Sequence, residues 1–303
     1  MSTQNPRLCE GRVAIITGAG RGVGREHALM LAAHGAKVVV NDIGASADGT
    51  GRDLSPAAEV VAEIKKAGGE AITDAHDVSD WNGAKAMIEA AVAKFGRLDV
   101  LINNAGILRD RMLTNMAEDE WDAVIKVHLK GTFAPARHAS AYWRDQSKVT
   151  GKPVNARIIN TSSTSGIYGN VGQSNYGAAK AGIAAFTIIA ARELRRYGVT
   201  VNAISPSAQT RMTEGLRELT DEQRARRNPR WVSPVVTWLA SEQSQGVSGR
   251  VFQAGNGIVS VCEGWRRGPT IDQMDDPVKL GPIVKDMVAR AKKNVGMDGL
   301  DLD

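Results

Sequence analysis

Residues 13–24 read VAIITGAGRGVG, an apolar run that ends in closely spaced glycines. The residues that follow, as far as Gly35, repeat their apolar side chains at helical spacing. A turn of this kind lets the backbone approach a phosphate, because glycine accepts positive φ and the first amides of a helix lack partners. The spacing departs from Gly-x-Gly-x-x-Gly, since the sixth position counted from Gly18 is Val23. We predict a strand, a dinucleotide-binding turn and a helix, with an ordinary tight turn as the alternative.

A second apolar run, residues 36–40, leads to Asp42, which lies 24 residues beyond Gly18. A carboxylate at that distance suits hydrogen bonds from the adenosine ribose and repels a 2′-phosphate, so it favours NAD over NADP. Arg21 is the opposing signal, because a guanidinium could pair with a 2′-phosphate. The alternative for Arg21 is a solvated or structural arginine. We expect NAD as the cofactor, with NADP the less favoured one.

Tyr176 and Lys180 are four residues apart, and Ser163 precedes the tyrosine by thirteen residues. A four-residue gap places both side chains on one face of a helix. A phenol with a pKa near ~10 needs about 4 kcal/mol of stabilisation to act as a base near neutrality. An ammonium at ~4 Å supplies about that much at an effective dielectric constant of ~20. The pattern predicts a proton-transfer site in which Ser163 holds the substrate oxygen, whereas the alternative is a tyrosine packed for structure alone.

Strand-like runs alternate with helical segments along most of the 303 residues. The runs are almost entirely apolar, which is typical of strands covered by helices on both faces. We predict one α/β domain with a Rossmann-type, doubly wound, seven-stranded parallel sheet whose ligands bind at the carboxyl ends of the strands. The predicted strands are residues 12–17, 36–41, 70–76, 98–102, 156–161, 199–204 and 250–254.

These motifs occur in the order found in the short-chain dehydrogenase/reductase family, which the chain resembles from about residue 10 to about residue 260. The motifs are the glycine turn, Asp42, Asn103-Asn104-Ala105-Gly106, Ser163, Tyr176 and Lys180. Within the family, four further segments are similar to the (3R)-hydroxyacyl-CoA dehydrogenase unit of peroxisomal multifunctional enzymes of type 2. They are residues 107–111, 127–131, 165–170 and 207–213.

The resemblance implies three catalytic residues. Tyr176 is the expected acid/base, Lys180 lowers its pKa and holds the nicotinamide ribose, and Ser163 donates to the substrate oxygen. No metal is expected. The implied cofactor-binding residues are Gly18, Arg21, Gly22, Val23, Gly24, Asp42, Asp77, Val78, Asn103, Ala105, Gly106, Tyr176, Lys180 and Thr210.

Two positions depart from the family pattern. His128 stands where most members have asparagine, and Ser207 follows Pro206 where most have glycine. His128 either helps to hold a relay water or is simply a packed histidine, and we favour the packed role.

The reaction that the resemblance implies is hydride transfer between NAD and a secondary alcohol or ketone. The expected substrate is a (3R)-hydroxyacyl-CoA thioester with a fatty or steroid side-chain acyl group. Two alternatives stay open. One is an NAD(P)-dependent reductase of a steroid, quinone or other ketone, because family members share catalytic residues while their loops select the substrate. The other is a nicotinamide-binding sensor without catalysis.

Composition restricts the remaining function classes. The net charge is +5, but acidic residues are interspersed and no long basic run occurs, so we expect no nucleic-acid partner. No apolar run approaches the roughly 18 residues of a membrane helix, so no membrane partner is expected either. Cys9 and Cys262 show no metal-ligand spacing and suit a reducing compartment, which predicts a cytoplasmic protein without a structural disulfide.

We divide the chain into a dinucleotide-binding and catalytic domain, residues 1–264, and a C-terminal extension, residues 265–303. Residues 207–231 should cap the substrate pocket, and from 211 to 230 they hold six arginines against four acids, which suits the phosphates of CoA or a solvated helical face. A turn-rich insertion at 44–53 should skirt the adenosine end of the cofactor or form a plain surface loop.

The extension should contain an amphipathic helix at 282–294. It is expected to lie over a neighbouring subunit or the substrate cleft, or to fray. Small residues from 177 to 185 suit close packing of the catalytic helix, and related proteins are dimers or tetramers, so we expect a homodimer or homotetramer.

Overall fold

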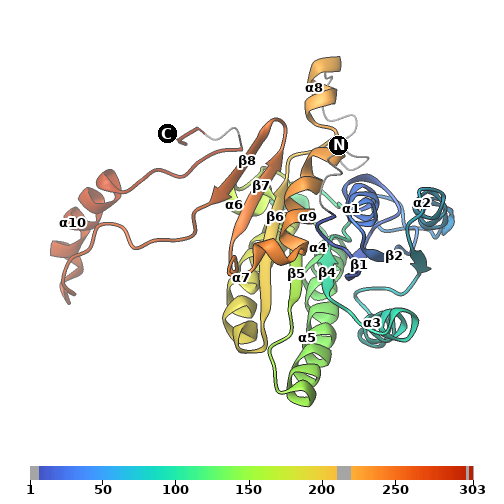
Figure 1. The fold of residues 1–303 in the computed structure, drawn as a ribbon. Coiled ribbons are helices and arrows are strands. Elements are labelled where there is room, and N and C mark those ends of the chain that lie inside the picture. Colours follow the sequence, from blue (N-terminus) through green and yellow to red (C-terminus); the bar gives the residue numbers. More distant parts are fainter. Residues whose placement is uncertain (1–6, 210–219, 298–299, 303) are drawn as a thin grey trace.

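The computed structural model describes residues 7–209, 220–297 and 300–302. Its centre is an eight-stranded sheet in the order β3-β2-β1-β4-β5-β6-β7-β8 (Figure 1). All seven predicted strands are present and run parallel. The strands are β1 (Val13–Thr17), β2 (Lys37–Asn41), β3 (Ala71–Asp74), β4 (Val100–Asn103), β5 (Ala156–Thr161), β6 (Val199–Pro206), β7 (Val251–Gly255) and β8 (Ile258–Cys262).

The eighth strand corrects the prediction of a seven-stranded sheet. β8 pairs antiparallel with β7, and Gly255 lies opposite Ile258 across a two-residue turn. Asn256 and Gly257 form that turn with φ of 52° and 83°. Asn-Gly is favoured there because both turn positions of a tight hairpin need positive φ. β8 is absent from the predicted strands because its side chains are mostly exposed on both faces, unlike the apolar runs of buried strands.

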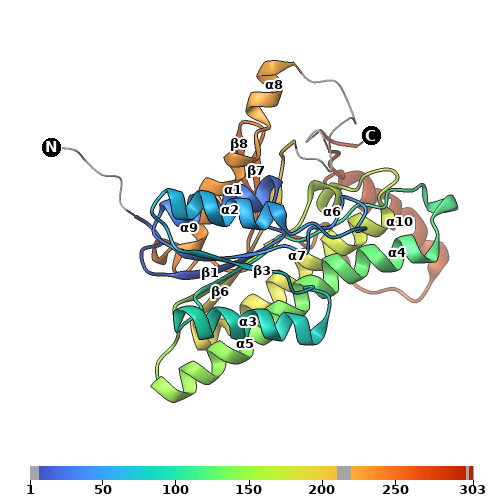
Figure 2. The ribbon, with the colours of Figure 1, turned by 90° about the vertical axis from the view of Figure 1, so that its right-hand side faces the viewer.

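Helices cover both faces of the sheet, as Figure 2 shows. Alternate side chains of β1 point to opposite faces of the sheet. Ala14 and Ile16 pack in a hydrophobic cluster with residues of α1, α2 and α9. Val13 and Ile15 pack in a second cluster with residues of α3, α5 and α7. This arrangement confirms the doubly wound α/β fold. The helices are α1 (Gly22–Ala33), α2 (Ser55–Lys66), α3 (Trp81–Phe95), α4 (Glu118–Ile125), α5 (Gly131–Thr150), α6 (Thr164–Tyr168), α7 (Ser174–Leu194), α8 (Asp221–Arg226), α9 (Ser233–Ala240) and α10 (Pro277–Arg290).

The C-terminal extension leaves the body of the molecule, and α10 stands apart from the sheet (Figure 1), whereas Gly296, Met297 and Leu302 beyond α10 return to line the pocket. α10 buries none of its residues. It begins at Pro277, five residues before the predicted start, because the Asp276 carboxylate accepts hydrogen bonds from the amides of Val278 and Lys279. Pro277 fits the first helical position, where an amide hydrogen has no partner to lose. Pro282, the predicted start of the helix, lies inside it, and α10 ends at Arg290 rather than at the predicted Asn294.

Among residues 7–209, 220–297 and 300–302, no helix combines the length and apolar character that a membrane crossing requires.

Candidate active site

A pocket of about 1200 Å³ lies at the carboxyl ends of the parallel strands. The strands end there because β1, β2, β4 and β5 run in the same direction. The pocket gathers twelve of the predicted site residues. They are Gly18, Arg21, Gly22, Val23, Asp42, Asp77, Val78, Ala105, Gly106, Ser163, Tyr176 and Lys180.

Two predicted cofactor residues do not line the pocket. Gly24 is buried at the start of α1, where a Cβ would come within 2.2 Å of the Gly18 carbonyl oxygen, so its smallness serves helix packing. Asn103 is buried at the end of β4 and donates a hydrogen bond to Asn160 at 2.9 Å. The next residue, Asn104, faces the pocket in its place. A third predicted residue, Thr210, lies outside the described residues.

The glycine turn between β1 and α1 is shaped for close approach. Gly18 has φ of +62°, and a Cβ there would lie 2.8 Å from the Cα of Ala105. Asn104 holds the turn, because its side-chain amide donates to the carbonyl oxygens of Thr17 and Gly18, each at 3.0 Å. With α1 beginning at Gly22, this cradle fits a pyrophosphate bound against the helix amides.

Asp42 lies beside that cradle, just beyond β2. One carboxylate oxygen accepts from the amide of Gly20 at 2.8 Å and the other from the amide of Gly44 at 2.7 Å. Each oxygen keeps a lone pair that can accept a ribose hydroxyl. Arg21 forms an ion pair at 3.0 Å with Asp53, so its guanidinium is already matched with a carboxylate.

The insertion at 44–53 reaches further than expected. Its first half lines the pocket and then meets the segment that follows β4. The amide of Leu108 donates to the carbonyl of Ala47 at 2.9 Å, and the Arg109 guanidinium donates to the carbonyl of Asp48 at 3.1 Å. The insertion therefore crosses from the β2 end of the pocket to the β4 end.

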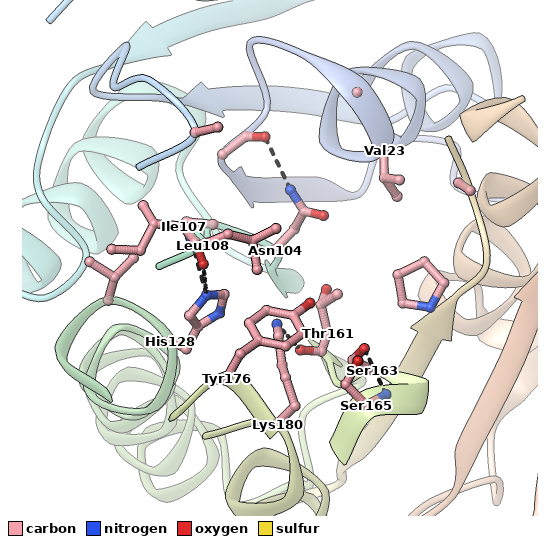
Figure 3. Close-up of a pocket in the computed structure, with 18 of the residues that line it drawn as sticks. Val23, Asn104, Ile107, Leu108, His128, Thr161, Ser163, Ser165, Tyr176 and Lys180 are labelled. Atoms are coloured by element: carbon pink, nitrogen blue, oxygen red, sulfur yellow. Dashed lines mark hydrogen bonds between the residues drawn. The ribbon is translucent and has the colours of Figure 1, made fainter. Parts of the chain in front are cut away.

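Ser163, Tyr176 and Lys180 converge on the other side of the pocket (Figure 3). Ser163 caps α6, and the other two side chains project from one face of α7. Burial raises the pKa of Tyr176 to about 12, although a hydrogen bond with Ser163 acts in the opposite direction. The phenol is therefore protonated at neutral pH in this arrangement.

Lys180 differs from what we expected of it. Its ammonium donates to the backbone oxygen of Thr161 at 2.6 Å and lies 5.5 Å from the centre of the Tyr176 ring. Burial lowers the pKa of Lys180 to about 7. In this arrangement the ammonium is directed at a carbonyl and is itself desolvated, so the effect expected of Lys180 on the pKa of Tyr176 stays a prediction.

His128 lies beside Tyr176, with the ring centres 5.1 Å apart in an edge contact. It belongs to a π-helical turn, Lys126–Lys130, which joins α4 to α5. Its Nε2 lies 2.7 Å from the carbonyl oxygen of Ile107. Burial lowers the pKa of His128 well below its ordinary value, so the ring is neutral. Gly106 leaves room for the ring, since a Cβ there would come within 2.3 Å of its Cε1.

Comparison with known proteins identifies the family of this chain. Residues 12–223 match the family described as short chain dehydrogenase. The chain belongs to the short-chain dehydrogenase family. It is therefore an oxidoreductase that acts on CH–OH groups with a nicotinamide cofactor.

Two curated relatives carry informative names. The chain is 44% identical over 289 residues to peroxisomal multifunctional enzyme type 2 of Drosophila melanogaster, covering 95% of this chain and 46% of the relative. It is 46% identical over 259 residues to hydroxyacyl-CoA dehydrogenase ChsB1 of Mycobacterium tuberculosis, covering 82% of this chain and 79% of the relative. The chain thus spans about half the length of the first protein and most of the second.

Solved structures agree on the fold. A short chain dehydrogenase from Mycobacterium avium superimposes with a TM-score of 0.85 at 52% identity, covering 95% of this chain and 98% of that one. A dehydrogenase/reductase from Sinorhizobium meliloti gives a TM-score of 0.71 at 30% identity, with coverages of 83% and 97%.

Asn104 and Gln173 are among the pocket residues of this dehydrogenase that were not predicted. Asn103 was predicted in place of Asn104, because the alternation of side chains along a strand does not tell which of two adjacent residues faces a pocket at the strand end. Gln173 immediately precedes α7 and lies three residues before Tyr176. That spacing on a helix was an available signal, since residues three apart share a face.

Proposed function

We propose that this enzyme transfers a hydride between NAD and the 3-hydroxyl group of a (3R)-hydroxyacyl-CoA. The observation that carries the proposal is the convergence of Ser163, Tyr176 and Lys180 on a pocket whose opposite wall is the glycine turn. The names of the Drosophila and Mycobacterium relatives support a hydroxyacyl-CoA as the substrate.

In the oxidation direction, Tyr176 removes the hydroxyl proton while Ser163 donates a hydrogen bond to the same oxygen. Both groups must be held within hydrogen-bond reach of that oxygen, and their common place in one pocket at α6 and α7 supports these roles. Bound NAD would supply the hydride acceptor. Because burial holds the pKa of Tyr176 at about 12, a positive charge near the phenol is needed to make it an effective base, and Lys180 is the cation in reach.

The choice of NAD rests on Asp42 and Arg21. The Asp42 carboxylate would repel a 2′-phosphate, and Arg21 is engaged by Asp53. Asp42→Ala should lower the ratio of kcat/KM for NAD to that for NADP by about tenfold or more, since roughly 1.4 kcal/mol of selectivity corresponds to tenfold. An unchanged ratio would place cofactor choice elsewhere.

Recognition of the CoA moiety is proposed for the segment around α8. Arg227 lines the pocket, and the amide of Gln209 donates to its carbonyl at 2.7 Å, which holds the two ends of the cap together. Arg224 and Arg226 are exposed on α8. Replacing all three arginines by alanine should raise KM for the CoA thioester and spare the short pantetheine analogue. Equal effects on both substrates would contradict this assignment.

The deciding assay follows NADH formation with (3R)- and (3S)-hydroxyacyl-CoA of several chain lengths. Each thioester is repeated with NADP, and free steroid alcohols serve as comparison substrates. NAD-dependent oxidation confined to the (3R) thioesters is expected. Turnover of a free alcohol without turnover of any thioester would retain the dehydrogenase and reject the acyl-CoA substrate. No turnover at all would favour a nicotinamide-binding sensor.

A homodimer or homotetramer in the cytoplasm completes the proposal. Phe133 on α5 and Ile188 and Ile189 on α7 expose apolar side chains on neighbouring helices, a pattern suited to contact with a second copy. Cys9 and Cys262 are both unpaired, which is compatible with a reducing compartment. A monomeric mass by light scattering at micromolar concentration would contradict the assembly.

A further inference from the structure

Gln173 joins three segments around the reacting groups. Its Nε2 donates a hydrogen bond to the Asp110 carboxylate at 2.7 Å, on the segment that follows β4. Its Oε1 accepts from the hydroxyl of Ser165 on α6 at 2.7 Å and from the Asn170 side chain at 2.9 Å. Gln173 itself immediately precedes α7, which carries Tyr176. One buried amide therefore connects the β4 segment, α6 and α7.

The partners allow only one orientation of this amide. A carboxylate accepts hydrogen bonds, so it must face the NH₂ group, and the Asn170 side chain donates, so it must face the oxygen. The exposed fraction is 9% for Gln173 and 6% for Ser165. At that burial, loss of one partner would leave a polar group desolvated and without a hydrogen bond, which costs free energy. The network is therefore expected to keep a single geometry.

The network ends at Ser163. The amide of Ser165 donates to the Ser163 hydroxyl oxygen at 3.2 Å. A serine hydroxyl has one hydrogen to donate, and with its oxygen already accepting from the backbone that hydrogen serves the pocket, where Tyr176 is a hydrogen-bond partner of the same hydroxyl. Ser163 is thus prepared as a donor, the role that a substrate oxygen gaining negative charge requires.

We propose that Gln173 is a positioning residue: anchored by Asp110, it fixes the Ser165 turn and thereby keeps Ser163 aimed as a hydrogen-bond donor to the substrate oxygen. This inference rests on the donor role given to Ser163 under the proposed function. Ser165, Gln173 and Tyr176 all line the pocket, so a shift of this turn also moves part of the pocket wall.

The first variant removes the amide without changing its size greatly. Gln173→Leu should lower kcat for (3R)-hydroxydecanoyl-CoA by roughly 100-fold, because a displacement of about 1 Å at a reacting group costs that much. KM should change by less than about threefold, since the turn acts on the reacting oxygen rather than on the bulk of the thioester. Gln146→Leu on the exposed face of α5 makes the same chemical change and is the matched control.

A charge exchange tests the Asp110 anchor. Gln173→Glu sets two carboxylates against each other at about pH 8.5 and should lower kcat as Gln173→Leu does. Asp110→Asn keeps an acceptor for Nε2 and should stay within about threefold of the wild type. The double variant Asp110→Asn/Gln173→Glu restores a donor and an acceptor in exchanged positions, so it should regain at least about tenfold over Gln173→Glu alone.

Hydrogen exchange of the Ser165 amide gives a readout that needs no substrate. Loss of Gln173 should speed this exchange by about tenfold or more, because the amide bonded to Ser163 opens with the turn. If the wild type oxidises none of the thioesters, the proposed substrate is wrong and the exchange rate still decides the positioning role. An unchanged exchange rate in folded Gln173→Leu would overturn it, as would a double variant no more active than Gln173→Glu.

Discussion

The glycine turn and the C-terminal extension differ in how strongly contacts within the chain restrict which residue can occupy a position. At the turn, a single added methyl group would meet backbone atoms, as the 2.2 Å gap between a Gly24 Cβ and the Gly18 oxygen shows. In the extension, a Cβ at Gly281 meets nothing within 4 Å. The sequence of the turn is dictated by contacts within the chain, whereas α10 makes its local hydrogen bonds and little else.

The largest effect is expected at the catalytic pair, which shares the buried character of the turn. Tyr176→Phe removes only the hydroxyl, so turnover should fall by about 10³-fold or more while the ring keeps its packing. NADH binding, followed by cofactor fluorescence, should stay within about twofold. Retained turnover would mean that another group is the base.

Lys180 should make stability depend on pH. Burial lowers the pKa of Lys180 to about 7 from an ordinary value of 10.5, so between these values the unfolded chain binds more protons than the folded one. This contribution makes the wild type more stable as pH rises, by on the order of 5 kcal/mol across the window.

Lys180→Met removes that dependence. The variant should be more stable than the wild type near pH 7, and its advantage should shrink toward about pH 10. Urea unfolding at several pH values measures the difference. A constant advantage at every pH would show that Lys180 is not desolvated in the folded state.

A matched pair of glycine substitutions tests the comparison directly. Gly24→Ala forces a Cβ against backbone and should cost about 3 kcal/mol of unfolding free energy, with weaker NADH binding as α1 shifts. Gly281→Ala lies in an exposed helix and should be neutral or stabilise by up to about 1 kcal/mol. Urea unfolding compares the two. Equal costs would erase the distinction between the regions.

The smallest stability effect should follow removal of residues 265–303. Since α10 buries no residue, the free energy of unfolding should change by less than about 1 kcal/mol. Gly296, Met297 and Leu302 nevertheless line the pocket, so KM for the thioester should rise severalfold. A stability loss that depends on protein concentration would instead show the extension packed against a second copy.

Much of the fold could be predicted because its signals are local. The seven parallel strands could be predicted from apolar runs, since strands that are buried on both faces are apolar along most of their length. β8 was not predicted because its side chains are largely exposed, although the Asn-Gly turn before it is typical of a β-hairpin. The predicted start of α10 at Pro282 was wrong because the Asp276 cap and Pro277 form an earlier helix start.

The site shows the same division. Local spacing on a helix was enough to bring Tyr176 and Lys180 to one pocket, and the insertion at 44–53 was recognisable from its turn residues. The electrostatics were not accessible in this way. Whether the Lys180 ammonium faces the phenol or the Thr161 carbonyl depends on how β5 packs against α7, and the pKa of each group follows from that burial.

By itself, the sequence determined the apolar strands of the sheet, the glycine turn suited to a phosphate and the identity of the reacting groups. These features depend on glycine φ, apolar runs and helical spacing, which act over a few residues. Only the tertiary structure decided that Asn104 rather than Asn103 faces the pocket, that Gly106 makes room for His128, and that Asp110, Gln173 and Ser165 meet. Those contacts join segments far apart in the chain, and their direction depends on burial, which no local pattern contains.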